Sequence, residues 1–409
     1  MTLVLDQPTI LVPDVLAALE PRPDVRTWDW IQENGRMHDM SPFDGDRVPW
    51  LEGVCDAYDH PEVRTVTLQW GTRLGKTAGS FQIMAANMVN DPQPGLFSSS
   101  TEKLTKRTVK KKIYPILGAI DQTAEQLPPE HLRAWDLIRL SQSTWAVAWS
   151  GSATMLADID AYYGHANEVD KWSYNEQQGG EVGEGDPLDQ WDERFKEYPD
   201  SKQIYECSPT VKGTSRINKK LLASNNCRYW VPCPGCRRRQ VLKMGTRKRG
   251  EEAAGKGGLR WDRLPDGTHD PDLARNTARY VCEHCRKEIH DEHRFEMMRA
   301  GRWAPEGCRV DKRGRVIGTP KRGMRNWGSQ LSSLYSLQMR WGDVAAKFVE
   351  SKDHPRSLQM FVNGWMSDVW ELYKAKSEPE TVGERLTTED EQGIIPEWAT
   401  WVFAGICSE

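Results

Sequence analysis

Thr65-Val-Thr-Leu-Gln-Trp-Gly-Thr-Arg-Leu-Gly-Lys-Thr77 is the most informative segment of this 409-residue chain. Its β-branched beginning, from Thr65 to Gln69, predicts a strand. A glycine-containing turn then ends in Gly75-Lys76-Thr77, and a helix-compatible segment runs from Ala78 to Met88. A strand, such a turn and a helix form the context that a phosphate-binding loop requires. The segment therefore predicts an α/β fold of the P-loop NTPase class.

Each residue type in this loop has a task. Glycine lets backbone N–H groups close around phosphates, Lys76 would reach the β- and γ-phosphates, and Thr77 would offer its hydroxyl to Mg²⁺. We therefore expect ATP and Mg²⁺ as cofactors. The alternative is a chance Gly-Lys-Thr sequence in a surface turn. The expected nucleotide-binding residues are Gly71, Thr72, Gly75, Lys76 and Thr77.

The loop departs from the usual G-x-x-x-x-G-K-[ST] pattern in two ways. Trp70 stands five positions before Gly75, and the nearest upstream glycine is Gly71, one residue late. Arg73 also lies inside the loop. Because cations stabilise the charge that develops during phosphoryl transfer, Arg73 is a candidate catalytic residue acting within the same subunit.

The segments after the loop alternate between strand-like and helix-like patterns as far as about residue 210. Such alternation predicts a central parallel sheet flanked by crossover helices, with the ligand at the carboxyl ends of the strands. The expected segments are Thr65–Gln69, Ala78–Val89, Gly95–Ser100, Lys103–Leu117, Trp145–Trp149, Tyr162–Ala166 and Gln203–Ser208.

A P-loop enzyme needs a second, acidic element that shapes the Mg²⁺ shell and activates water. The best candidate ends in Asn167-Glu168-Val-Asp170, where Glu168 is the expected catalytic base and Asn167 occupies the Mg²⁺-shell position without a charge. Asp158 and Asp160 are the fallback, and a purely polar loop is the alternative. Farther on, Ser208, Thr210 and Lys212 follow another strand-like run and are candidates for coupling nucleotide state to movement; a plain polar turn is the alternative.

Two C-x-x-C pairs, Cys233/Cys236 and Cys282/Cys285, each follow a β-like run. Their separation exceeds the roughly 15–20 residues of a compact ribbon, and the loop from Gly245 to Gly258 accounts for part of the excess. Four thiolates would close a structural Zn²⁺ site, so we expect an inserted zinc-ribbon-like β element. Unpaired buried thiols are the alternative. The other cysteines lack such spacing, and His284 and His290 are spare ligand candidates.

Composition limits the remaining possibilities. The net charge of −4 gives no global nucleic-acid signature, and no apolar run is long enough to span a membrane. Local basic clusters still favour nucleic acid over merely solvated faces, and acidic blocks at 176–200 and 378–391 balance them. The clusters comprise Lys103, Lys106, Arg107, Lys110, Lys111 and Lys112; Arg237, Arg238, Arg239, Lys243, Arg247, Lys248 and Arg249; and Arg313, Arg315, Lys321, Arg322 and Arg325.

From about Ser41 onward the chain resembles the large terminase subunit of tailed phages, of the lambda-like GpA type. No single motif carries this resemblance, but the order and spacing of the motifs together are specific. They are Pro49-Trp50-Leu51, Gly71 to Thr77, Ser100-Thr-Glu-Lys103, Asn167-Glu-Val-Asp170, Ser208-Pro-Thr-Val-Lys-Gly-Thr-Ser-Arg-Ile217, Cys233-Pro-Gly-Cys236, Val281-Cys-Glu-His-Cys285, Phe361-Val-Asn-Gly364 and Trp370-Glu371.

The resemblance implies an ATPase that translocates double-stranded DNA into a procapsid in the host cell cytoplasm. Its implied partners are a small terminase subunit, a portal protein and further copies of itself. Family members also carry a nuclease whose first acidic ligand follows an Ala-Gly-hydrophobic strand. Here Phe403-Ala-Gly-Ile406 is followed by Cys407, so we expect the nuclease to be nearly absent and endonuclease activity to be missing from this chain.

The expected parts are an N-terminal arm (1–40), a P-loop ATPase core (41–226), a zinc-ribbon-like insertion (227–300), the rest of the ATPase region with a linker (301–398) and the first strand of a truncated nuclease (399–409). Two other functions stay open. One is a helicase-like DNA translocase, and the other is a non-hydrolysing, zinc-stapled fragment that binds ATP and DNA.

Overall fold

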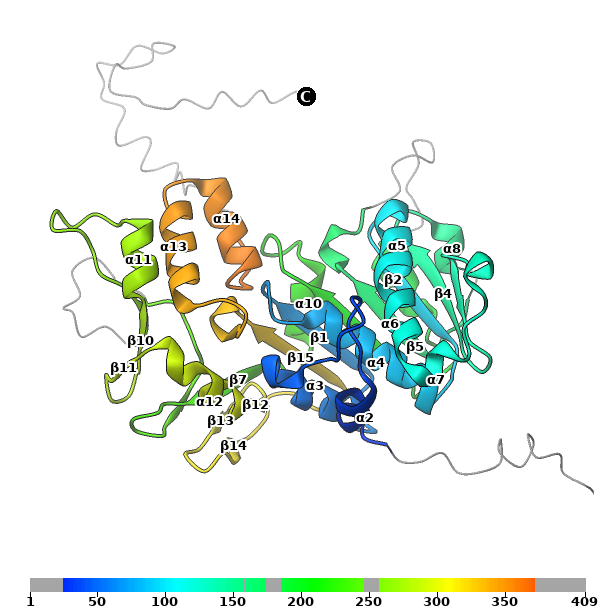
Figure 1. The fold of residues 1–409 in the computed structure, drawn as a ribbon, viewed down its shortest axis with the longest axis horizontal. Helices are drawn as coiled ribbons and strands as arrows, with labels where there is room; N and C mark the ends of the chain where they lie inside the picture. The colour runs from blue at the N-terminus through cyan, green and yellow to red at the C-terminus, as the bar shows by residue number, and fades with distance from the viewer. Residues whose placement is uncertain (1–24, 158, 174–184, 246–256, 372–409) are drawn as a thin grey trace, which may run out of the picture. The chain divides into compact units, whose positions relative to one another are not determined.

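The computed structural model describes residues 25–157, 159–173, 185–245 and 257–371 (Figure 1). Its main feature is a ten-stranded sheet in the order β12-β7-β15-β1-β6-β5-β2-β4-β3, with β8 paired to β7. These strands are β1 (Thr65–Trp70), β2 (Gly95–Ser99), β3 (Leu137–Arg139), β4 (Thr144–Trp149), β5 (Tyr163–Asn167), β6 (Lys202–Cys207), β7 (Cys227–Pro232), β8 (Arg239–Gln240), β12 (Arg302–Ala304) and β15 (Asn326–Leu331).

Two smaller sheets lie outside this order. One contains β9 (Gly258–Arg260), β10 (Arg279–Val281) and β11 (Glu288–Ile289), and the other pairs β13 (Cys308–Val310) with β14 (Val316–Gly318). The α-helices are α2 (Thr27–Asn34), α3 (Trp50–Asp59), α4 (Lys76–Asn90), α5 (Glu102–Thr108), α6 (Tyr114–Ala119), α7 (Asp121–Ala124), α8 (Ala153–Ala157), α9 (Pro187–Glu193), α10 (Arg216–Ala223), α11 (Pro271–Thr277), α12 (Arg294–Arg299), α13 (Trp341–Ser351) and α14 (Pro355–Gly364).

The strands from β7 to β4 along the sheet order pair in parallel, whereas β12, β8 and β3 are antiparallel additions. Parallel strands need crossover connections, which the helices between them supply. The predicted α/β fold with a mostly parallel sheet is confirmed. Each strand expected between residues 65 and 210 is present within a residue or two of its expected bounds.

One central strand was missed. β15 pairs with β1 from Thr65↔Asn326 to Trp70↔Leu331, although the sequence analysis assigned no strand there. Its sequence, Asn-Trp-Gly-Ser-Gln-Leu, has no β-branched residue, so local propensity gave no signal. The strand forms because Trp327 and Leu331 are buried, and because Ser329 accepts a hydrogen bond from the Trp70 indole (2.9 Å).

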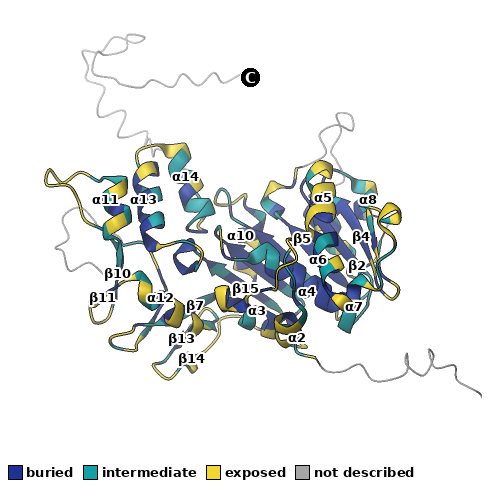
Figure 2. Cartoon of the chain, viewed as in Figure 1, coloured by how far each residue is buried: buried dark blue, intermediate teal, exposed yellow. Residues whose placement is uncertain are grey.

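The sheet forms the centre of the hydrophobic core, and its strands are largely buried in Figure 2. β2 is buried along its whole length and β1 beyond its first residue, as expected for parallel strands covered on both faces. The segment expected to be an arm includes α2, whose Trp30 and Ile31 are buried in this core. Packed structure therefore begins before residue 41.

The cysteine-bearing region is continuous with the main sheet. β7 leads directly into the first C-x-x-C pair and pairs in parallel with β15, and β12 adds to its other side. The second pair follows β10 in the smaller sheet. The expected segments at 1–24, most of Gly245 to Gly258, the acidic run 378–391 and the strand at 403–406 with Cys407 lie outside the described residues.

Candidate functional site

The loop between β1 and α4 has the backbone of an anion site. Gly75 has a left-handed backbone (φ 74°) and directly precedes α4. Any Cβ at Gly75 would lie 2.7 Å from Cγ1 of Val48, so only glycine fits without a shift. Among the described residues, no acceptor binds the backbone N–H groups from Arg73 to Thr77. Unpaired N–H groups at a helix N-terminus attract phosphate.

The outer side of the loop is fixed by residues from the far end of the chain. Thr72 donates its backbone N–H to Gly364 O (2.7 Å), and Ser333 donates its hydroxyl to Thr72 O (3.0 Å). Ser336 binds Arg73 O (2.7 Å) in the same way. These contacts occupy the N–H of Thr72 and the carbonyl groups of Thr72 and Arg73, and they leave the N–H groups from Arg73 to Thr77 for a ligand. Sequence reasoning missed both serines, because nothing local links residues some 260 positions apart.

The two departures from the usual loop pattern have structural counterparts. Trp70 is the last residue of β1, is completely buried and stacks on Trp303 with ring centroids 6.3 Å apart. The Trp70 side chain is therefore part of the hydrophobic core. Gly71 is crowded instead, since a Cβ there would lie 2.7 Å from Trp365 O. Arg73 has φ 59° and an exposed side chain, so it is free to turn toward a bound ligand.

Glu168 lies at the carboxyl end of β5, beside the loop lysine. Its Oε1 is 3.6 Å from Lys76 Nζ, and its Oε2 is 3.1 Å from Lys171 Nζ. Burial disfavours the charged form, but the two lysines outweigh burial and lower the pKa of Glu168 below its ordinary value. The carboxylate is therefore ionised at neutral pH, as a base that orients water must be.

β6 lies between β1 and β5, so Lys76 and Glu168 follow strands that are not neighbours in the sheet. Asn167 precedes Glu168 and is mostly buried. Its Oδ1 accepts from Ser99 Oγ (3.2 Å), and its Nδ2 donates to Glu206 Oε1 (2.5 Å). Ser99 and Glu206 were not among the expected site residues; only the strand register brings them to Asn167.

The turn after β6 connects the site to the rest of the molecule. Ser208 donates its hydroxyl to Trp70 O (2.9 Å), and Thr210 donates to Asp170 Oδ2 (2.8 Å). The other oxygen of Asp170 accepts from Ile217 N (2.7 Å) in the first turn of α10. Thr210 O accepts from Asn363 Nδ2 of α14 (2.7 Å). One short segment thus contacts β1, the loop after β5 and α14 directly, and it reaches α10 through Asp170.

The two fallback acidic candidates are not placed in this arrangement. Asp160 is exposed, and Asp158 lies outside the described residues. Lys212, the third candidate of the turn after β6, donates its backbone N–H to Trp370 O (2.9 Å).

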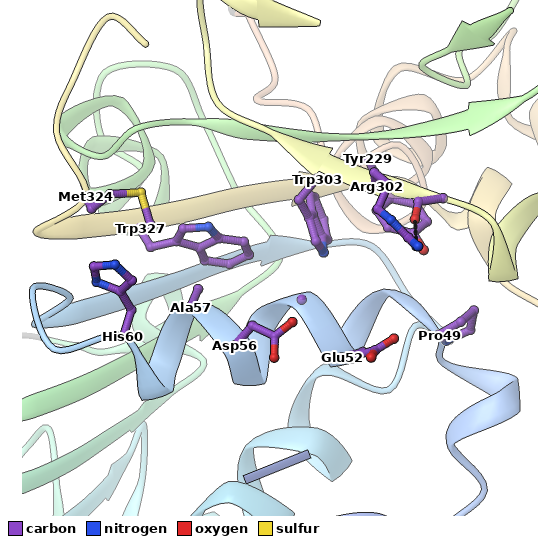
Figure 3. Close-up of a pocket in the computed structure, with 12 residues that line it drawn as sticks. Pro49, Glu52, Asp56, Ala57, His60, Tyr229, Arg302, Trp303, Met324 and Trp327 are labelled. Carbon is purple, nitrogen blue, oxygen red and sulfur yellow. Dashed lines mark hydrogen bonds between the residues drawn. The ribbon is translucent and has the colours of Figure 1, made fainter. Parts of the chain in front are cut away.

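A cavity of about 480 Å³ beside α3 is lined by none of the expected site residues (Figure 3). Its carboxylates, Glu52 and Asp56, bind Arg26 at 2.9 and 2.7 Å.

The four cysteines of the two C-x-x-C pairs meet in space. Their sulfur atoms all lie within 4.8 Å of one another, with Cys233 to Cys285 at 3.7 Å and Cys236 to Cys282 at 3.9 Å. Four thiolates around a tetrahedral ion with bonds of 2.3 Å would be about 3.8 Å apart. The spacing therefore fits a metal ion. Cys55, Cys207 and Cys227 are buried elsewhere, and Cys308 is half-buried.

Both cysteine turns have the same backbone. Arg237 and Arg286, each directly after the second cysteine of a pair, have φ values of 59° and 65°. Each donates its N–H to the carbonyl of the first cysteine, at 2.9 and 3.1 Å. Backbone N–H groups also point at sulfur, from Gly235 to Cys233 (3.3 Å) and from His284 to Cys282 (3.4 Å). Two matching turns that present sulfur to one point are typical of a metal centre.

Comparisons with known proteins agree with this arrangement. The family model "Phage terminase large subunit gpA, ATPase domain" matches residues 38–303, and "Terminase large subunit gpA, endonuclease domain" matches residues 326–407. The second match begins at β15, inside the central sheet. In the described part of the chain, no helix combines the length and apolar character needed to cross a bilayer.

The chain is also similar to individual phage proteins. It is 24% identical over 390 residues to the terminase large subunit of Enterobacteria phage P21, covering 91% of this chain and 55% of that protein. It is 25% identical over 235 residues to the terminase large subunit of Escherichia phage lambda, covering 55% of this chain and 33% of that protein. The chain thus spans about half the length of the P21 relative and a third of the lambda relative.

Among solved structures, the large terminase of bacteriophage HK97 aligns with a TM-score of 0.37 and 12% identity, over 46% of this chain and 38% of that one. Membership of a family follows instead from the match to the ATPase model. The gpA ATPase model covers well over half of the residues and contains the loop, Glu168 and all four clustered cysteines. This chain therefore belongs to the gpA family of phage terminase large subunits, of which it carries the ATPase domain.

Proposed function

We propose that this chain is the ATP-hydrolysing motor subunit of a phage terminase that moves double-stranded DNA into a procapsid. The observation that carries the proposal is the 3.6 Å approach of Lys76 and Glu168 at the carboxyl ends of the parallel strands, beside unpaired loop N–H groups. For phosphoryl transfer to water, a phosphate-binding lysine and a water-orienting carboxylate must both lie beside the same phosphate.

The free N–H groups from Arg73 to Thr77, with Gly75 among them, and the ammonium group of Lys76 would hold the phosphates of ATP. Gly71 and Thr72 would shape the start of the loop, because their own N–H groups bind Leu331 O and Gly364 O. Thr77 and Asn167 would face the Mg²⁺ shell; the ion, when bound, neutralises phosphate charge. Glu168 would orient the attacking water, and Arg73 would turn in from its exposed position to stabilise the charge of the transition state. The ionised Glu168 lies beside Lys76, and the exposed Arg73 side chain can move toward a ligand, as these roles require.

Ser208 and Thr210 are proposed to couple nucleotide state to movement. A change at the loop after β5 would reach Thr210 through Asp170, and from there α10 and α14. Ser208 donates a hydrogen bond to the carbonyl of Trp70, the last residue of β1. A shift of the loop that follows Trp70 would therefore move Ser208. A segment that contacts both sides of the nucleotide site and two helices is suited to this task.

The basic ridge, which we define as Lys103, Lys106, Arg107, Lys110, Lys111 and Lys112, is the proposed contact for the DNA backbone. All six side chains are exposed on α5 and the following π-helical turn, Val109–Ile113. None forms an ion pair with a carboxylate among the described residues. In the third basic cluster, by contrast, Arg315 binds Asp311 (2.9 Å) and Lys321 binds Glu306 (2.5 Å). Unpaired cations are the ones available to phosphates.

Replacing Lys106, Lys110 and Lys111 together with glutamine is expected to weaken binding of double-stranded DNA of any sequence. If each lysine neutralises one phosphate, the slope of log affinity against log salt falls by about three. Fluorescence anisotropy across a salt series measures this slope. The control is the triple change Arg315→Gln, Lys321→Gln and Lys347→Gln, three cations that each pair with a carboxylate, which should leave it unchanged. Equal losses in both variants would show that DNA binding is not centred on the basic ridge.

The cysteine cluster is proposed to hold one structural Zn²⁺ within a zinc-ribbon-like element at about 227–300. All four sulfurs are supplied by the protein, which leaves no open position for catalysis. We further propose that the ATPase core includes α2, which packs into it before residue 41, and that the described residues from 301 to 371 complete it. A small terminase subunit, a portal protein and other copies of this chain are the proposed partners, in the host cytoplasm.

The function is tested by measuring ATP hydrolysis by the purified chain with and without linear double-stranded DNA. We expect slow hydrolysis that DNA stimulates. The Glu168→Gln variant gives the background rate of hydrolysis. Binding of ATP without hydrolysis under either condition would overturn the motor assignment. Strand displacement without any packaging partner would instead assign the chain to helicase-like translocases.

A further inference from the structure

Glu206 on β6 is a completely buried carboxylate that no assigned role explains. Its Oε1 accepts from Asn167 Nδ2 (2.5 Å) and lies 3.2 Å from His165 Nε2. Its Oε2 is also buried and has no hydrogen-bond partner among the described residues. A buried carboxylate oxygen without a partner costs free energy, so such groups are typically retained for a function.

Glu206 forms hydrogen bonds with both Asn167 and Glu168 at the end of β5. Its side chain fixes the amide of Asn167, because a flipped amide would place Oδ1 against the carboxylate. Its backbone carbonyl accepts the N–H of Glu168 (2.8 Å). The register Asn167↔Glu206 in the parallel β5–β6 pair sets both contacts. The Mg²⁺-shell candidate and the candidate base are therefore held by one residue.

The pair also explains why position 167 is uncharged. An aspartate at 167 would bring a second carboxylate to the distance now occupied by the Asn167–Glu206 hydrogen bond, 2.5 Å. Two carboxylates at such a distance cannot both ionise without a large penalty. Asparagine at 167 and glutamate at 206 are thus mutually dependent, and the pair carries a single carboxylate, on β6 instead of β5.

We propose that Glu206 supplies the carboxylate of the magnesium end of the nucleotide site and acts through Asn167 as a positioning residue. The proposal rests on the proposed function, since it assigns a role within the same ATP site. It predicts that the acid and the amide can be exchanged between the two strands.

The test compares the wild type with Asn167→Asp, Glu206→Gln and the double variant that carries both. Two quantities are measured: the thermal midpoint without nucleotide, and the gain in ATP affinity that Mg²⁺ gives over EDTA. Asp192→Asn is the matched control, because Asp192 is a half-buried carboxylate that accepts hydrogen bonds from Tyr205 (2.7 Å) and Lys220 (2.5 Å) outside the site.

We expect Glu206→Gln to fold normally and to lose about 10- to 100-fold of the Mg²⁺-dependent gain, the usual effect of removing a group behind a metal ligand. Asn167→Asp should lower the midpoint and the gain, and the double variant should recover both. Asp192→Asn should lower the midpoint alone.

A full Mg²⁺-dependent gain in Glu206→Gln would overturn the assignment of Glu206, as would double-variant losses equal to the sum of the single losses. The failure of the proposed function looks different. In that case the wild type itself would show no Mg²⁺-dependent gain in ATP affinity.

Discussion

Glu168→Gln is expected to reduce ATP turnover about 10²- to 10⁴-fold, the usual contribution of a positioned general base. Glutamine keeps the shape of the side chain but removes the charge that faces Lys76 at 3.6 Å and Lys171 at 3.1 Å. Binding of ATP should change only a few-fold, because the loop N–H groups and Lys76 remain. Single-turnover hydrolysis and equilibrium binding of a fluorescent ATP analogue separate the two effects.

The matched control for this change is Glu193→Gln. Glu193 lies on α9 and also forms an ion pair with a lysine three residues later, Lys196, but at the surface. Such exposed pairs contribute little to stability, so turnover should stay at the wild-type level. Lys171→Ala is a second control, which removes one neighbour of Glu168 and leaves Lys76. Turnover retained in Glu168→Gln would remove Glu168 from the role of base.

The acid limb of the rate profile follows from the same contacts. Because burial is outweighed by Lys76 and Lys171, the pKa of Glu168 lies below its ordinary value. The base is therefore lost only at a pH below the usual range of a glutamate. In Lys171→Ala this limb is expected to move toward higher pH, since one of the two cations is gone.

The strand–turn–helix segment around Gly75 could be predicted from the sequence because its requirements are local. A strand, a turn with glycine at positive φ, and a helix N-terminus follow one another along thirteen residues. The cysteine pairs are similar, since each turn is formed within six consecutive residues with matching backbone contacts. Such motifs carry their own geometry wherever they occur in a chain.

The parts that could not be predicted depend on distant partners. β15 has no β-branched residue, and it forms because β1 and β7 flank it. Glu206 was an ordinary residue in a strand-like run, and Asn167 a simple departure from the expected aspartate. Only the register of β5 against β6 shows that the two belong together. Neither the propensity of a residue nor the spacing of a motif depends on such cross-strand partners, so neither can predict them.

Replacing Cys282 with serine is expected to unfold much of the molecule. Structural zinc in small peptides supplies about 10–16 kcal/mol of apparent binding free energy, which matches the whole stability of about 5–15 kcal/mol of a typical domain. Cys282 is completely buried and belongs to the proposed zinc cluster. Cys308→Ser is the control, because Cys308 is a half-buried thiol outside the cluster.

Because such a variant can fail to accumulate, the wild type provides a second measurement. Metal analysis should give one zinc per chain. A strong chelator should then lower the thermal midpoint, and added Zn²⁺ should restore it. A purified, folded chain without zinc, or a midpoint that does not respond to the chelator, would contradict the zinc proposal and leave the four cysteines as unpaired thiols.

Zinc removal should also reduce ATP turnover, because contacts lead from the cysteine turns to the nucleotide loop. The first turn follows β7, whose Tyr229 carbonyl accepts from Tyr335 Oη (2.7 Å), and Tyr335 Oη in turn accepts from Leu242 N (2.7 Å). Tyr335 directly precedes Ser336, which binds Arg73 O in the loop. Loss of the metal would loosen the turn after β7 and the contact of Leu242 with Tyr335, and with them Ser336, which fixes the loop. Turnover should therefore fall in step with zinc content, whereas in Cys308→Ser both should remain at the wild-type level.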